Sequence, residues 1–142
     1  MKTPFHIVIF KADQALRKQL GKDMKEYGLF SGQPKVLRWI ISHENCKLKD
    51  IADACDIECA TASKIIDGLA ANDMVKRQVD ANNKRALRIQ ITPKGERSLM
   101  AWNTHCLDVE KIALQGFSKQ ERDTFLAYLE RMYQNVSGKT IE

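Results

Sequence analysis

The sequence predicts a mainly α-helical fold with one small β-hairpin, and three observations indicate this class. Apolar residues recur three and four positions apart along most of the chain, as one face of a helix requires. Apolar and polar residues alternate in two short segments, 75–79 and 87–91, which flank a polar turn. The 142 residues, of which 44% are hydrophobic, suffice for one domain with a core and are too few for two. We therefore expect a single domain over residues 1–142.

The first predicted helix covers about residues 3–27. Thr3 is able to cap it, and Pro4 suits the first helical position because no amide proton is needed there. Gly28 is suited to the left-handed conformation that ends a helix. One side of the helix carries Phe5, Val8, Ile9, Ala12, Leu16 and Leu20, and a second side carries Ile7 and Phe10. Because a helix with two apolar sides needs two partners, we expect part of it to contact another subunit.

Three shorter helices follow in the prediction. Ser31 and Pro34 begin the first of them, which ends near residues 43–45. The second runs from Leu48 to about Asp56. The third has Ala62, Ile65, Ile66 and Leu69 on one face and Thr61, Ser63, Lys64 and Asp67 on the other. Two short helices joined by a turn of about four residues, the second with a small, polar first turn, form a helix-turn-helix pattern.

The predicted hairpin lies in the most basic part of the chain. Residues 76–97 include seven basic and two acidic side chains, a balance of +5 that equals the net charge of the whole chain. The polar turn at residues 80–84 gives the hairpin a cationic tip. Clustered Lys and Arg side chains neutralise phosphates and release counterions, so this distribution of charge favours a nucleic-acid partner.

Two longer helices complete the prediction. Thr92 and Pro93 indicate a helix that runs to about Gly116, because a capping threonine precedes a proline at the first helical position. Ser118 and Glu121 have the spacing of a capping box at the start of the last helix, which runs to about residue 137. Apolar residues at helical spacing follow both starts.

Four short motifs carry a resemblance to a known family. Residues 60–69 are ATASKIIDGL, residues 74–77 are MVKR, residues 83–86 are NKRA and residues 91–95 are ITPKG. Together with the order of helices and hairpin, they resemble MarR-type winged-helix transcriptional regulators over essentially the whole chain. The motifs match the recognition helix of that family and the start, tip and end of its wing.

Two positions depart from the family pattern. Asn83 stands where the family has an acid that steadies the wing arginine, which is Arg85 in this chain. Arg85 therefore gains at most a hydrogen bond from Asn83, unless Asp80 takes the place of the missing acid. Asp73 stands where the family has a glycine between the recognition helix and the wing. Asn and Asp are the residues that tolerate a left-handed turn best after glycine, so we expect the turn to keep its geometry.

The resemblance implies a winged helix-turn-helix DNA-binding lobe, about residues 32–92, and a helical dimerisation lobe, about residues 3–27 and 93–137. A homodimer would bind double-stranded DNA at a palindromic operator with half-sites about 34 Å apart. The implied function is a sequence-specific transcriptional regulator, a repressor that responds to a small-molecule effector bound between the lobes. Rigid-body motion would then change the spacing of the two recognition helices.

The candidate DNA contacts are Thr61, Ser63, Lys64, Arg77, Lys84, Arg85 and Arg88. The first three lie at the start of the recognition helix, where side chains reach base edges and phosphates in the major groove. Arg85 lies at the tip of the wing, and the narrow minor groove concentrates the negative potential that would attract it. Arg77 has a second interpretation, as a tie between its strand and the helices.

Thiol and metal chemistry give alternative regulators of the same fold. The chain has four cysteines without a C-x-x-C pair, and we expect free thiols, some of them buried. Cys59 is the redox candidate because it lies near the start of the recognition helix. His43 and His105 are weak zinc candidates, since they lack the spacing of a strong site. A winged-helix module for protein contact is a further alternative.

Other classes of function find no support in the sequence. It contains no nucleophile elbow, phosphate loop or strong metal motif, so we expect neither an enzyme nor a cofactor. No apolar run approaches the roughly 18 residues of a membrane span, and no secretory signal is present. We therefore expect a cytoplasmic protein with no membrane partner. Trp39 and Trp102 are expected in the core or in the lining of a cleft.

Overall fold

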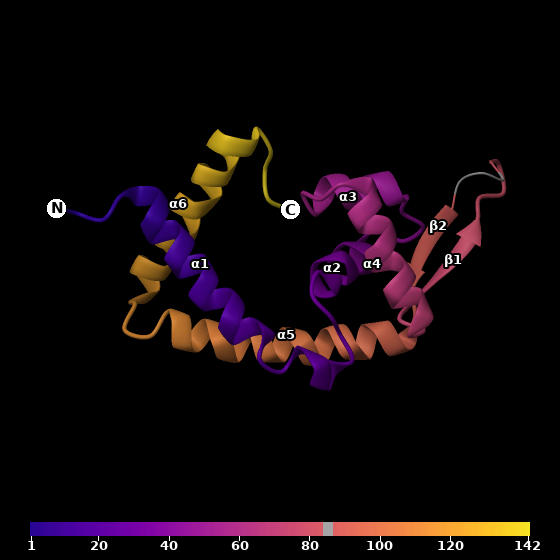
Figure 1. Cartoon of the computed structure of the whole chain (residues 1–142), viewed down its shortest axis with the longest axis horizontal. Coiled ribbons are helices and arrows are strands. Elements are labelled where there is room, and N and C mark those ends of the chain that lie inside the picture. The colour runs from indigo at the N-terminus through magenta and orange to yellow at the C-terminus, as the bar shows by residue number, and fades with distance from the viewer. Residues whose placement is uncertain (84–86) are drawn as a thin grey trace. The chain divides into compact units, whose positions relative to one another are not determined.

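The computed structural model describes residues 1–83 and 87–142. Two compact units divide the chain, Met1–Leu107 and Asp108–Glu142, and the single-domain organisation stays a prediction. The elements, in chain order, are α1 (Phe5–Gly21), the 3-10 helix η1 (Met24–Tyr27), α2 (Gln33–Ser42), α3 (Leu48–Ala54), α4 (Cys59–Ala71), β1 (Val75–Val79), β2 (Leu87–Ile91), α5 (Pro93–Ala113) and α6 (Lys119–Ser137). Figure 1 labels the α-helices and the two strands. This mainly helical architecture with one antiparallel hairpin confirms the predicted fold class.

The ends of α1 differ from the prediction. Pro4, not Thr3, takes the N-cap position, because its extended ψ of 149° keeps it outside the helix. Its carbonyl accepts the amides of Ile7 and Val8 at 3.0 and 3.1 Å. The helix ends at Gly21, earlier than expected, and the chain then tightens into η1. Gly28 ends η1 with a φ of 72°, so its predicted left-handed conformation is confirmed.

Helices α2, α3 and α4 surround the core of the first unit. The apolar faces predicted for them supply most of its fully buried side chains, Val36, Leu37, Ile40, Ile51, Ile66 and Leu69, to which Leu29 adds one from the preceding loop. A turn through Asp56, whose φ is 56°, joins α3 to α4. The predicted helix-turn-helix is therefore present, and packing of its apolar faces holds α4 against the other two helices.

Asp73 makes the turn between α4 and β1. Its φ of 58° is left-handed, as expected for the residue that replaces the family's glycine. Across this turn the amide of Met74 donates to the Leu69 carbonyl at 2.9 Å. The Thr92 hydroxyl accepts the Gly95 amide at 3.0 Å, which confirms the predicted cap of α5. That hydroxyl also lies 2.5 Å from the Asp73 carbonyl, so the start of α5 is bonded to the turn that follows α4.

The hairpin pairs β1 with β2 from Val75↔Ile91 to Val79↔Leu87. Strand β1 packs beside α4 and β2 beside α2. The loop between α2 and α3 adds an isolated bridge, Cys46↔Ile89, in which the Ile89 amide donates to the Cys46 carbonyl at 3.0 Å. The middle of β2 is thus bonded to the loop between α2 and α3.

The second unit contains the end of α5 and all of α6. Helix α5 ends at Ala113, three residues before Gly116, whose left-handed φ of 83° lies in the loop. The predicted capping box is confirmed: the Ser118 hydroxyl accepts the Glu121 amide, and the Glu121 carboxylate accepts the Ser118 amide. In neither described range, 1–83 or 87–142, is a helix long and apolar enough to cross a membrane.

Candidate nucleic-acid interface

The start of α4 presents two of the three predicted major-groove residues to solvent. Thr61 and Lys64 are exposed, whereas Ser63 is half-buried. Ala62 and Ile66 anchor the opposite face in the core. This division follows from helical periodicity, since residues one position apart point in directions about 100° apart. Thr61 and Lys64 can therefore reach a groove while the helix stays packed.

Arg77 is tied to the recognition helix. Its Nη2 forms an ion pair with Oδ1 of Asp67 in α4, and about a third of the Arg77 side chain is exposed. The second interpretation of Arg77, as a link between strand and helix, is therefore the one that its contacts support. The pair holds β1 against α4.

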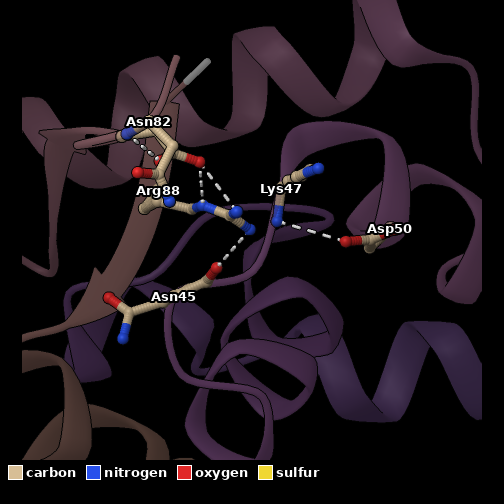
Figure 2. A network of polar contacts seen from close by, with 6 residues as sticks. Asn45, Lys47, Asp50, Asn82 and Arg88 are labelled. Atoms are coloured by element: carbon tan, nitrogen blue, oxygen red, sulfur yellow. Dashed lines mark hydrogen bonds and ion pairs between the residues drawn. The ribbon is translucent and has the colours of Figure 1, made fainter. Parts of the chain in front are cut away.

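Arg88 lies at the centre of a polar network (Figure 2). Its Nε and Nη2 lie 2.8 and 2.7 Å from Oδ2 of Asp80, and its Nη1 donates to the Asn45 carbonyl at 3.2 Å. The other carboxylate oxygen of Asp80 accepts the amide of Asn82 at 2.9 Å. These bonds join the hairpin to itself and to the loop between α2 and α3.

Asp80 is held in its charged form. The hydrogen bond from the Asn82 amide, followed by that from Arg88, lowers the pKa of its carboxyl below the usual range. The predicted contacts Lys84 and Arg85 lie outside the described residues, so the suggestion that Asp80 steadies Arg85 stays a prediction. Among the described residues, Asp80 forms its ion pair with Arg88.

The four cysteines are free thiols, as predicted. Cys46 is buried, Cys55 and Cys106 are half-buried, and Cys59 is exposed in the first turn of α4. Burial raises the pKa of the Cys46, Cys55 and Cys106 thiols. These three are therefore weaker nucleophiles than an ordinary thiol, and Cys59 stays the redox candidate.

The two candidate zinc ligands have other contacts. The ring of His43 stacks on Trp39 with centroids 3.5 Å apart, and its Nδ1 lies 2.9 Å from the Trp39 carbonyl. Nε2 of His105 lies 3.1 Å from the carbonyl of Leu20. Within residues 1–83 and 87–142, no group of three or more His, Cys, Asp or Glu side chains is placed to hold a metal ion.

A cavity of about 840 Å³ lies in the first unit, between α1, α2 and the part of α5 that belongs to this unit. Leu16, Leu20 and the buried Trp102 line it, so the cleft predicted for Trp102 is present. Its charged lining consists of Asp13, Arg17, Lys25, Lys35 and Arg38. Sequence reasoning missed these basic residues, because they come from separate elements and form no local motif.

Known proteins share this arrangement. The MarR family profile matches residues 31–87, from the start of α2 to the start of β2. The HTH-type transcriptional repressor YetL of Bacillus subtilis is 23% identical over 128 residues, which cover 86% of this chain and 77% of YetL. The crystal structure of the transcriptional regulator SlyA is similar with a TM-score of 0.87 and 29% identity, covering 96% of each chain.

A structure solved with DNA has the same fold. The S. aureus MepR–DNA complex matches with a TM-score of 0.85 and 18% identity, over 94% of this chain and 99% of the MepR chain. The fold, the helix-turn-helix with its basic hairpin and these likenesses agree with the resemblance seen in the sequence motifs. They describe a DNA-binding regulator and not an enzyme. The helix-turn-helix and hairpin of this chain match the MarR family of winged-helix transcriptional regulators, and the whole chain is similar in fold to the regulator SlyA.

Proposed function

We propose that this protein is a ligand-responsive repressor that binds a palindromic operator as a homodimer. The observation that carries the proposal is the exposure of Thr61 and Lys64 on a helix whose other face is fixed in the core. That helix enters the major groove, and the basic hairpin beside it follows the minor groove. A protein that acts on DNA in this way is expected in the cytoplasm.

Exposed apolar side chains support the homodimer. Phe5, Val8 and Phe10 of α1 are 68, 53 and 57% exposed. In the second unit, Tyr128 and Val136 of α6 are exposed as well. Monomeric proteins rarely leave such apolar faces in water, and a second copy of the chain would cover them symmetrically. Two copies would also present two recognition helices, as a palindrome requires.

The cavity of the first unit supports an effector. Its volume of about 840 Å³ falls within the usual size of a small-molecule site. Arg17, Lys25, Lys35 and Arg38 line it together with one acid, Asp13, over an apolar floor. An anionic molecule with an apolar body fits this lining best. Because α2 forms one wall and begins the DNA-binding lobe, occupancy would bias the position of that lobe.

Selection of DNA from a random duplex library tests the proposal. We expect the full-length protein to enrich a palindrome whose half-sites are one helical turn apart, and to bind it as a dimer in sedimentation measurements. Binding should collapse as salt is raised, because phosphate contacts release counterions. Enrichment of a single asymmetric half-site would contradict the dimer. Failure to enrich any sequence would favour a winged-helix module for protein contact.

A further inference from the structure

Arg88 uses all three nitrogens of its guanidinium within the protein. Nε and Nη2 face the Asp80 carboxylate, and Nη1 faces the Asn45 carbonyl (Figure 2). The Arg88 side chain is 33% exposed and that of Asp80 only 12% exposed. A phosphate-binding arginine needs its guanidinium edge directed at solvent, whereas this one is directed at two protein acceptors.

Asn45 is held in a conformation that brings it to β2. Its φ of 60° is left-handed, a conformation that Asn adopts more readily than most residues. Its carbonyl accepts from Arg88, and its side-chain oxygen accepts from Nε2 of Gln90 at 2.6 Å. Between these two bonds the Ile89 amide donates to the Cys46 carbonyl. Three successive residues of β2 are therefore bonded to two successive residues of the loop.

The same loop leads directly into α3. Lys47 is the N-cap of that helix, and its amide donates to the Asp50 carboxylate at 3.3 Å. The positive charge of Lys47 also helps to lower the pKa of Asp80. The hairpin and the helix-turn-helix are in this way joined through the loop rather than through the strand ends alone.

We propose that Arg88 is a positioning residue, which fastens the hairpin to the loop between α2 and α3 through Asp80 and Asn45. The positive charge of Arg88 fixes the orientation of the hairpin and does not contact a DNA phosphate. In this chain, Asp80 takes the role of the acid that the family has at the position of Asn83, three residues later. Its partner is Arg88, in strand β2. The consequence for operator binding rests on the proposed function, whereas the consequence for the hairpin does not.

The first experiment needs no DNA and measures amide hydrogen exchange in the full-length protein. Arg88→Lys keeps the positive charge and cannot reach both acceptors, and Asp80→Asn removes the paired charge at nearly constant shape. We expect the Ile89 amide to exchange roughly tenfold faster in both variants, while the α4 amides keep their protection. Lys76→Ala, which removes a charge from the exposed side of the same hairpin, is the control. Wild-type protection of Ile89 in both variants would overturn the proposal.

The second experiment measures affinity for the selected operator across a range of salt. A positioning role predicts that Arg88→Lys and Asp80→Asn each bind about three- to tenfold more weakly, with the salt slope unchanged. A phosphate role predicts the opposite result: Arg88→Lys binds as wild type does, and Asp80→Asn binds more tightly because a negative charge near DNA is lost. Lys76→Ala is the comparison for a phosphate contact: loss of a lysine that contacts a DNA phosphate lowers the salt slope.

The two experiments separate this proposal from the proposed function. If the wild-type protein selects no DNA while Ile89 exchange rises in both variants, the proposed function fails and the positioning role stands. If DNA is selected and the two variants bind as a phosphate contact predicts, the positioning role fails and the proposed function stands. A double-mutant cycle between Asp80→Ala and Arg88→Ala gives the coupling directly, and additive effects would contradict the contact.

Discussion

Gly95, in the first turn of α5, lies directly against the carbonyl of Met74 at the start of the hairpin. A Cβ atom on Gly95 would overlap the Met74 carbonyl oxygen and lie 2.8 Å from Cγ1 of Ile91. Because the obstacle is backbone, it cannot rotate away. The Thr92 hydroxyl bonds to the same carbonyl at 3.0 Å, so any shift here would also disturb the cap of α5.

Gly95→Ala is therefore expected to destabilise the fold. Forcing a methyl group into this contact should lower the free energy of unfolding by about 1 to 3 kcal/mol, measured by urea denaturation. Gly21→Ala is the matched control, since nothing lies within 4 Å of a Cβ at that position. It should be neutral or stabilising by roughly 0.4 to 1 kcal/mol. Equal stability of the two variants would contradict the close approach of α5 and Met74.

Arg85→Ala is expected to weaken operator binding by roughly 1 to 3 kcal/mol, because a minor-groove contact at the tip of the wing would be lost. Lys84→Ala should cost less and mainly reduce the salt slope, as a phosphate contact does. Fluorescence anisotropy with the selected operator measures both. If Arg85→Ala binds as wild type does, the assignment of the wing is wrong.

Lys64→Ala is expected to reduce the slope of log affinity against log salt by about 0.9, the value for one phosphate contact on duplex DNA. Thr61→Ala should instead change which bases are selected, because a hydroxyl on the first turn reaches base edges. Lys111→Ala removes the same charge from the second unit and serves as the control. An unchanged slope in Lys64→Ala would remove this lysine from the interface.

Helicity of α6 is expected to depend on pH through Glu121. The amide and hydroxyl of Ser118 lower the pKa of the Glu121 carboxyl. A carboxyl whose pKa is lower in the folded than in the unfolded state stabilises the fold above the unfolded pKa, about 4.3, and this stabilisation is lost as pH falls through the folded pKa. Circular dichroism between pH 6 and about pH 2 should show the loss. Glu121→Gln should flatten that pH dependence, and an unaltered curve would contradict the capping box.

The four thiols are expected to react in a fixed order with a neutral alkylating reagent. Cys59 should react first because it is exposed, and Cys46 last because it is buried and burial raises the pKa of its thiol. Mass spectrometry of the partly modified native protein gives the order. Cys59→Ser should abolish the fastest phase. If that phase persists, the exposure of α4 in the native protein differs from the one described.

Peroxide treatment followed by the DNA-binding measurement decides the redox alternative. Unchanged affinity with every thiol modified would eliminate a thiol switch, whereas a loss confined to wild type and absent from Cys59→Ser would support it. Elemental analysis of the purified protein tests the zinc alternative in the same preparation. Stoichiometric zinc would support His43 and His105 as zinc ligands.

The sequence by itself determined which segments form the main helices and the two strands, because their signals are local. Helical spacing of apolar residues, the capping residues Thr92 and Ser118, and the left-handed positions Gly28 and Asp73 all act within about one turn of backbone. Each of these predictions is confirmed. The predicted N-cap of α1, Thr3, was wrong. Both Thr3 and Pro4 are compatible with the first turn, and local preference alone does not choose between them.

Only the tertiary structure decided what Arg77 and Arg88 of the hairpin contact. Arg77 pairs with a residue ten positions away and Arg88 with a carbonyl 43 positions away, and such partners depend on how α4, the loop before α3 and the hairpin pack together. Packing likewise brings the positive charges of Lys35 and Arg38 to the wall of the cavity. Composition shows that a segment is basic, but the direction of each side chain, toward DNA or toward the protein, is set by contacts between distant parts of the chain.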